Sequence, residues 1–369
     1  MRAIVAFIKD KLRQIDPLLF ICTSLMSLLS ITVLVGARNS DYGGTRTILM
    51  QAAMTAAGIV IMITLANLDF SSLPPLFYII VFVCSVGLMA LLWTPLGESA
   101  GENRNWIKIP GLTSIQPSEF VRFSFILTFS KHLSVIGDEI NHPKRLVGLA
   151  LHAGVIVGLM LLSGDLGMAL VYMGIIAVML YCAGLSLWYF LGGTVLLAAA
   201  FPFIWDHLAD YQKKRIIVGV NPDIDPLDKG LQQIQSRACI AGGGITGRGI
   251  NGAGTYKEMY GCLTDFFFAT YAEMFGLLGC IVFIGLLAFL IARLTILAKR
   301  SSGLFGTFVC AGVIGMIVVQ SVENIGMCLC LLPVVGITLP FMSAGGSSVL
   351  SIYLIFGLVH STFEPKSRY

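Results

Sequence analysis

The run FFFATYAEMFGLLGCIVFIGLLAFLIARLTI, residues 266–296, decides the fold of this chain. An α-helix needs about 20 predominantly apolar residues to cross a bilayer. This run is longer than that and holds only two charged side chains, Glu273 and Arg293. It therefore predicts a membrane-spanning helix.

The composition extends that prediction to the whole chain. Of 369 residues, 56% are hydrophobic and 12% are charged, and the mean hydropathy is +0.86. Soluble domains carry about 25% charged residues. These values exclude a soluble enzyme, a disordered chain and a secreted disulfide scaffold. The net charge of +4 is too small and too dispersed to indicate a nucleic-acid partner.

Apolar runs long enough to span a membrane recur along the sequence, with polar segments between them. The runs are 18–36, 48–68, 76–93, 119–135, 146–162, 167–184, 187–205, 266–296, 304–331 and 347–363. They predict an all-α polytopic membrane protein with about ten transmembrane helices, built as a single domain over residues 1–369.

The orientation follows from the basic residues of the short loops, which concentrate on the cytoplasmic side. A cytoplasmic N-terminus places Arg2, Lys9, Lys11, Arg13, Lys144, Arg145, Lys299, Arg300, Lys366 and Arg368 inside. The short outer loops then hold Arg38, Arg46, Arg104 and Lys108. Both termini are therefore expected in the cytoplasm. By parity, the long polar loop, about 206–263, is extracytoplasmic.

Ionisable side chains near membrane depth are the candidate functional residues, because burying them in lipid is costly. Asp265 stands at the outer start of the run at 266–296. It is either a helix N-cap or a carboxylate at the mouth of a cavity that acts as a base. Glu119 and Arg122 lie three residues apart, so they share a helix face as an ion pair or as the wall of a polar cavity. Asp165, in Ser163-Gly164-Asp165, is either a turn residue or functional.

Residues 242–252, GGGITGRGING, form a glycine-rich segment with a literal GxGxxG. No strand precedes it, so a dinucleotide site is rejected. The glycines could still present backbone N–H groups to an anion, with Arg237 and Arg248 adding charge suited to a phosphate. The alternative is a surface loop without a ligand. Cys239 and Cys262, in the same polar region, leave a disulfide open.

A proline-broken apolar stretch, residues 332–340, predicts an irregular segment buried against helices. It leads to the polar turn 343–348, which begins with Ser343. Glu323 and Asn324 interrupt an apolar run just before it, so they should face protein and not lipid.

Four motifs together resemble the SEDS family (shape, elongation, division, sporulation) of polytopic membrane proteins, the RodA and FtsW proteins. They occur in family order over about residues 104–348. They are Gln116-Pro117-Ser118-Glu119-Phe120 after Arg104-Asn105-Trp106, then Asp165-Leu166-Gly167, then the glycine-rich loop running to Thr264-Asp265-Phe266 with Glu273 and Gly276, and finally Leu332-Pro333-Val334-Val335-Gly336-Ile337-Thr338-Leu339-Pro340-Phe341-Met342-Ser343.

The resemblance implies a peptidoglycan glycosyltransferase in the bacterial cytoplasmic membrane. SEDS proteins polymerise lipid II at the outer face, and they work with a class B penicillin-binding protein within the elongasome or the divisome. The family's essential aspartate maps onto Asp265 and its motif glutamate onto Glu119. The basic residue three positions further on, usually lysine, is Arg122 here.

The sequence departs from the family pattern at several places. Glu258-Met259-Tyr260-Gly261-Cys262-Leu263 replaces the usual residues before Thr-Asp-Phe, and Met274 replaces a second glutamate after Glu273. Ala344 replaces a tyrosine, and Ser163-Gly164 replaces Gln-Pro before Asp165. Asp265 is retained, so the enzymatic interpretation stands. Asp16-Pro17, just before the first run, resembles RodA more than FtsW.

The implied reaction joins the 4-hydroxyl of a lipid II GlcNAc to the anomeric carbon of the growing strand. Asp265 would be the general base, or would hold a divalent cation, Mg²⁺ or Mn²⁺, against the diphosphate. Arg104, Arg237 and Arg248 would contact the diphosphate, while Glu119, Arg122, Asp165 and Ser343 complete the substrate cavity. A lipid II flippase and a non-enzymatic scaffold for the penicillin-binding protein are the alternatives.

Overall fold

The computed structural model describes residues 14–100, 103–108, 114–208, 210–228, 230–252, 254–301 and 303–363. Ten helices in this part of the chain correspond to the ten predicted spans. They are α2 (Pro17–Gly36), α3 (Thr45–Ala66), α4 (Pro75–Ala90), α5 (Pro117–Ile136), α6 (Pro143–Leu162), α7 (Leu166–Cys182), α8 (Leu187–His207), α11 (Phe267–Arg300), α12 (Leu304–Cys328) and α13 (Gly346–Ser361). The predicted all-α polytopic fold is confirmed. The orientation in the membrane stays a prediction, and "inner" and "outer" below name the two ends of the bundle according to it. Of the basic residues used for the orientation, Arg2, Lys9, Lys11, Arg13, Lys366 and Arg368 lie outside the described residues.

The helices differ in how clearly their sequences mark them as spans. Six segments among the described residues are long and apolar enough to cross a membrane, and α7, α8 and α13 are shorter apolar helices. The remaining helix, α5, is less apolar because it runs through the centre of the bundle and contacts α4, α12 and α13. Its polar side chains therefore meet protein instead of lipid.

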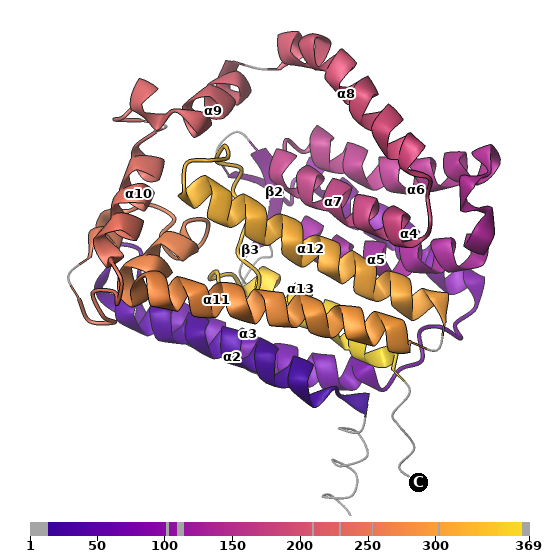
Figure 1. Cartoon of the computed structure of the whole chain (residues 1–369), viewed down its shortest axis with the longest axis horizontal. Coiled ribbons are helices and arrows are strands. Elements are labelled where there is room, and N and C mark those ends of the chain that lie inside the picture. Colours follow the sequence, from indigo (N-terminus) through magenta and orange to yellow (C-terminus); the bar gives the residue numbers. More distant parts are fainter. Residues whose placement is uncertain are drawn as a thin grey trace, which may run out of the picture.

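The connections at the outer end carry the remaining elements (Figure 1). A short antiparallel sheet in the order β1-β2-β3 precedes α5, and the long loop contains two helices, α9 and α10. The bounds are β1 Gly97–Ala100, β2 Asn103–Lys108, β3 Ser114–Ile115, α9 Asp210–Val220 and α10 Leu231–Gly243, with short 3₁₀ turns at η2 Ala37–Asn39, η3 Leu91–Trp93, η5 Pro222–Ile224 and η6 Thr255–Glu258. A further 3₁₀ turn, η4 Gly137–Asn141, joins α5 to α6 at the opposite end. The apolar runs alone did not predict the sheet.

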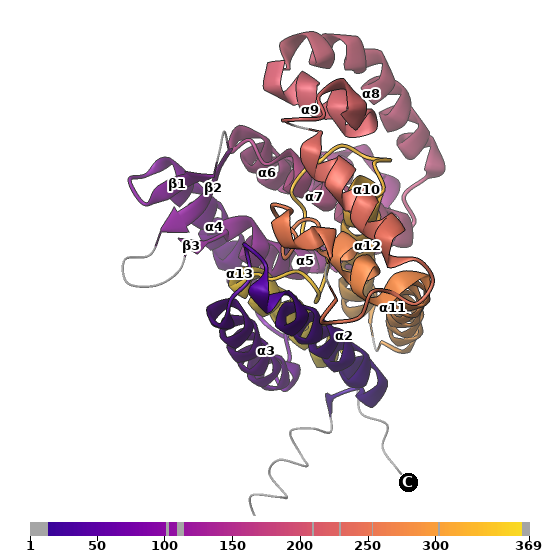
Figure 2. The same ribbon diagram turned by 90° about the vertical axis from the view of Figure 1, so that its left-hand side faces the viewer.

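Helix α8 lies apart from the bundle in both views (Figures 1 and 2). Large apolar side chains along it are exposed, among them Trp188, Leu196 and Phe203. In a membrane these side chains would contact lipid, which needs no further protein partner. We therefore expect the described side chains of α8 to pack mainly against lipid.

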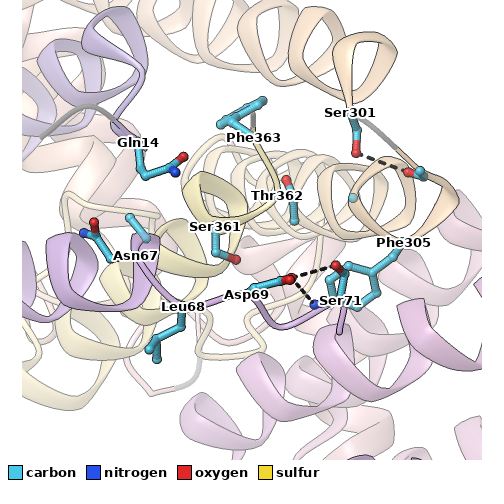
Figure 3. A pocket seen from close by; sticks show the side chains of 13 residues that line it. Gln14, Asn67, Leu68, Asp69, Ser71, Ser301, Phe305, Ser361, Thr362 and Phe363 are labelled. Atoms are coloured by element: carbon cyan, nitrogen blue, oxygen red, sulfur yellow. Dashed lines mark hydrogen bonds between the residues drawn. The ribbon is translucent and has the colours of Figure 1, made fainter. Parts of the chain in front are cut away.

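Both ends of the described chain lie at the same end of the bundle, as an even number of spans requires. The backbone N–H of Asp16 donates to Nδ1 of His360, 3.2 Å away, and Arg293 of α11 pairs with the Asp16 carboxylate. Gln14 and Phe363 line the same hollow of about 340 Å³ (Figure 3). We call it the inner-face hollow; hydroxyl and amide side chains and Asp69 give it a polar lining.

Candidate active site

Asp265 lies in the turn that leads into α11, and two neighbouring segments hold this turn through its backbone. Ser343 donates its hydroxyl to the carbonyl oxygen of Thr264, 2.5 Å away, and accepts from the backbone N–H of Leu339 at 2.8 Å. The N–H of Ala344 donates to the carbonyl of Leu263 at 2.7 Å. The hydroxyl of Ser343 is thus engaged with backbone groups, and its side chain is buried. Ser343 therefore stabilises the turn through hydrogen bonds to backbone groups.

A residue near the outer end of α12 also bonds to the backbone of this turn. The side-chain amide of Asn324 donates to the carbonyls of Asp265 and Ile337, both at 2.7 Å. Between them, Gly336 has φ +72°, which suits glycine, and a β-carbon there would lie 3.6 Å from Oδ2 of Asp265. The irregular segment thus runs directly beside the Asp265 carboxylate.

Asp265 itself is half-buried, so water and solutes reach it. Beside its turn, a second hollow of about 490 Å³ opens at the outer face; we call it the outer hollow. Thr264, the neighbour of Asp265, lines it together with Arg46 and the edge-to-face pair Tyr42–Tyr260, whose ring centroids are 5.5 Å apart. Its other lining residues are Thr47, Met50, Gln51, Gly261, Leu263, Ala344, Gly345 and Gly346.

Glu119 and Arg122 form a buried ion pair, one of the two arrangements that their spacing predicts. Their side chains are 2% and 1% exposed. Ser351 of α13 donates to Glu119 Oε2 at 2.9 Å and accepts from Arg122 Nη2 at 3.2 Å. The pair therefore joins α5 to α13 inside the bundle. It presents no charge to the outer surface.

Asp165 belongs to the same interior region. Its Oδ1 accepts from the N–H of Met168 at 3.0 Å, which caps α7, and its Oδ2 accepts from Gln116 at 3.2 Å and Asn105 at 3.4 Å. Burial raises the pKa of Asp165 above its ordinary value, and these hydrogen bonds together with the charge of Arg122 offset only part of that effect. We call Glu119, Arg122 and Asp165 the buried cluster.

Arg104 is engaged close by, at the outer sheet. Its Nη2 donates to the carbonyl of Thr94 at 2.9 Å, and its backbone N–H donates to Ser163 at 3.1 Å. The first contact joins β2 to the residue after η3, and the second attaches β2 to the turn between α6 and α7. Arg104 and Asn105 therefore bring the Arg-Asn-Trp loop to Asp165, an association that no local sequence pattern predicts.

The glycine-rich segment packs against α11 at the point where that helix is broken. Gly276 has φ +65°, and a β-carbon there would lie 2.3 Å from the backbone nitrogen of Gly247. The N–H groups of Arg248 and Gly249 donate to the carbonyls of Glu273 and Met274. In return, the carbonyls of Gly244 and Ile245 accept from Leu277 and Leu278. The loop thus supplies the hydrogen bonds that the broken helix lacks, so these amides are not free for an anion.

The two arginines of the long loop are placed differently. Arg248 lies 3.6 Å from Glu273, whose fully buried carboxylate also accepts from the N–H groups of Thr255 and Tyr256. Arg237 is more than half exposed, with Asp223 at 3.8 Å. Arg248 is therefore part of the loop's internal structure, whereas Arg237 is open to solutes. Cys239 and Cys262 are both free thiols, so they form no disulfide here.

The structure thus divides the predicted residues into two groups. Asp265 and Ser343 meet at the outer turn, and Glu119, Arg122 and Asp165 meet in the interior. Sequence reasoning placed Asn324 toward protein but did not foresee its bond to Asp265. It did not single out Ser351, because a serine in an apolar run carries no distinctive signal. Among the described residues, no group of three or more His, Cys, Asp or Glu could hold a metal ion on its own.

Known proteins resemble the chain over nearly its full length. The family model described as "Cell cycle protein", FTSW_RODA_SPOVE, matches residues 13–367. Stage V sporulation protein E of Bacillus subtilis (strain 168) is 32% identical over 327 residues, which cover 86% of this chain and 87% of that protein. Peptidoglycan glycosyltransferase MrdB of Escherichia coli (strain K12) is 31% identical over 356 residues, which cover 94% of this chain and 93% of that protein.

Solved structures agree with the fold. A chain from the work described as "Structural coordination of polymerization and crosslinking by a peptidoglycan synthase complex" has a TM-score of 0.80 and 29% identity, covering 94% of this chain and 96% of that chain. Thermus thermophilus rod shape determining protein RodA has a TM-score of 0.70 and 26% identity, covering 93% and 95%. From these matches together, the chain belongs to the FtsW/RodA/SpoVE family of cell cycle proteins.

Proposed function

We propose that this chain is a peptidoglycan glycosyltransferase that polymerises lipid II at the outer face of the bacterial cytoplasmic membrane. One observation carries the assignment to a site. Asp265 is half-buried and directly follows Thr264, which lines the outer hollow, and its turn is fixed through backbone groups by Ser343 and Asn324. The Escherichia coli relative is itself a peptidoglycan glycosyltransferase.

The chemistry follows from this placement. Asp265 takes the proton of the GlcNAc 4-hydroxyl, the oxygen forms a bond to the anomeric carbon of the growing strand, and undecaprenyl diphosphate leaves. The aromatic pair Tyr42–Tyr260 offers apolar ring surface to a sugar in the outer hollow. The exposed guanidinium of Arg46 provides positive charge there for a phosphate.

The other predicted substrate residues divide by their burial and by the contacts that they already make. Arg237 is open to the outer face, so we propose it as a diphosphate contact. Arg104 and Arg248 already bond to neighbouring carbonyls, and Glu119, Arg122, Asp165 and Ser343 are buried. We propose that these six residues hold the shape of the site, and that substrate binding depends on them indirectly.

A divalent cation also fits the site. Mg²⁺ commonly binds through one or two carboxylates together with substrate phosphates. Asp265 is a single, half-exposed carboxylate, so it could hold Mg²⁺ or Mn²⁺ together with the diphosphate of the substrate. When bound, the ion would neutralise charge on the leaving group.

The partner and the family branch complete the proposal. We propose a class B penicillin-binding protein of the elongasome or divisome as partner, since the structural neighbour with a TM-score of 0.80 belongs to a peptidoglycan synthase complex. We favour the RodA branch, because Asp16-Pro17 before the first span resembles RodA more than FtsW; in the structure Asp16 caps α2 and pairs with Arg293. The chain would act as a single membrane domain with an outer loop at 206–263.

A reconstitution experiment tests the function. The chain is purified with its partner into liposomes, fluorescent lipid II is added, and the products are separated by size, with and without a chelator. We expect glycan strands, and their loss with chelator would support the cation. Movement of lipid II between leaflets without strands would favour a flippase. If strands require only the partner's activity, the chain is a scaffold.

A further inference from the structure

Asn324 occupies a costly position for a polar side chain. It lies near the outer end of α12 and is fully buried (0% exposed). Its Oδ1 has no hydrogen-bond partner among the described residues. Leaving a buried acceptor without a partner costs free energy. We therefore ask which groups the two N–H donors of Asn324 bond.

Both donors of Asn324 bond to backbone carbonyls of other segments. One bond, of 2.7 Å, goes to Asp265, in the turn before α11, and the other, also of 2.7 Å, goes to Ile337, in the irregular segment. One rigid amide thus joins α12, the turn before α11 and the irregular segment. Because Gly336 is the neighbour of Ile337 and lies beside Oδ2 of Asp265, this amide sets the spacing between the carboxylate and the irregular segment.

We propose that Asn324 is a positioning residue for Asp265, and this inference rests on the proposed function. A general base must lie within hydrogen-bond reach of the proton that it removes. A displacement of about 1 Å at a reacting group lowers the rate about 10²-fold. Asn324 touches no reacting atom; it acts through the backbone of Asp265.

The matched test compares two residues of the same helix. Asn324→Leu keeps the size of the side chain and removes both donors. Gln320→Leu, one turn earlier, changes another buried amide of α12, for which the structure records no bond to the Asp265 turn. We expect Asn324→Leu to lower kcat for lipid II polymerisation about 10²-fold with KM within about twofold of wild type, and Gln320→Leu to lower kcat less than about threefold.

Amide hydrogen exchange gives a readout independent of activity. In Asn324→Leu, residues 261–268 should exchange at least about tenfold faster than in wild type, while the centre of α11 stays protected. Gln320→Leu should leave the exchange of 261–268 unchanged.

Three results would overturn the inference. The first is a wild-type kcat in Asn324→Leu, the second is an equal loss of kcat in Gln320→Leu, and the third is unchanged exchange at 261–268. An inactive wild-type chain would instead contradict the proposed function, and the exchange comparison would still decide whether Asn324 holds the turn.

Discussion

Two polar regions of this protein differ in how deeply their charged side chains are buried and in which atoms the neighbouring segments bond. In the buried cluster, the carboxylates of Glu119 and Asp165 and the guanidinium of Arg122 are at most 6% exposed, and their side chains bond to one another or to neighbouring polar groups. At Asp265, the hydrogen bonds from Asn324 and Ser343 go to the backbone of the turn, and the residue is only half-buried, next to Thr264 at the outer hollow.

The difference indicates where the chemistry takes place. A buried charge must be paired, and burial also keeps it away from a substrate. A turn held through its backbone fixes the position of a carboxylate that is less deeply buried. This difference in burial supports the proposed structural role of the buried cluster and the proposed role of Asp265 in the reaction.

The largest expected effect on stability lies in the buried cluster. Arg122→Met leaves Glu119 as a buried charge without its partner, so we expect a loss of about 3–5 kcal/mol in the free energy of unfolding. Thermal unfolding in detergent micelles measures it. The double variant Glu119→Gln/Arg122→Met should recover most of the loss. If Arg122→Met alone were as stable as wild type, the comparison would fail, because the buried Glu119 would then not need Arg122.

A smaller effect is expected beneath the Asp265 turn. Ser343→Ala removes the donor to Thr264 and the acceptor for Leu339, so it should cost about 1–3 kcal/mol and also slow polymerisation. The control is Ser361→Ala at the inner face, whose hydroxyl bonds within its own helix. Equal effects of the two variants on the polymerisation rate would show that the turn is not specifically held.

A smaller effect is expected on the pH dependence of stability, and it tests the burial of Asp165 in the buried cluster. Because burial raises the pKa of Asp165 above 3.8, the native chain binds this proton more tightly than the unfolded chain. The contribution of Asp165 to stability therefore falls as the pH rises from 3.8 through its raised pKa. The stability of Asp165→Asn relative to wild type should increase across that window. A difference that does not change with pH would show that burial of this group has no such effect.

The smallest effect belongs to the inner-face hollow. Asp69 is exposed and bonds to the backbone and hydroxyl groups of Ser71 (Figure 3). Asp69→Asn should change the free energy of unfolding by less than about 0.5 kcal/mol and leave strand synthesis unchanged. A marked loss of polymerisation in this variant would extend the functional region to the cytoplasmic side.

The sequence predicts the spans well because burial in lipid imposes a simple requirement on length and polarity. The run at 266–296 lies within α11, and the less apolar run at 119–135 lies within α5. Asp265 and the pair Glu119–Arg122 were recognised because charged groups near membrane depth are rare.

Other features depend on contacts between distant segments, which local patterns do not encode. The glycine-rich loop gave no sign that Arg248 and Gly249 would bond to Glu273 and Met274 across the break in α11. The bond from Asn324 to Asp265 spans 59 positions in the sequence. The sheet before α5 has strands too short for a periodic signal.

The initial rate of lipid II polymerisation tests the central claim most directly, measured for Asp265→Asn and for Asp41→Asn, a change at an exposed outer-face carboxylate. Both variants are purified with the partner and shown to unfold at the wild-type temperature. We expect Asp265→Asn to lower the rate by about 10²–10⁴-fold, the range that general-base catalysis supplies, and Asp41→Asn to keep the wild-type rate. Strand synthesis by Asp265→Asn at the wild-type rate would contradict the account.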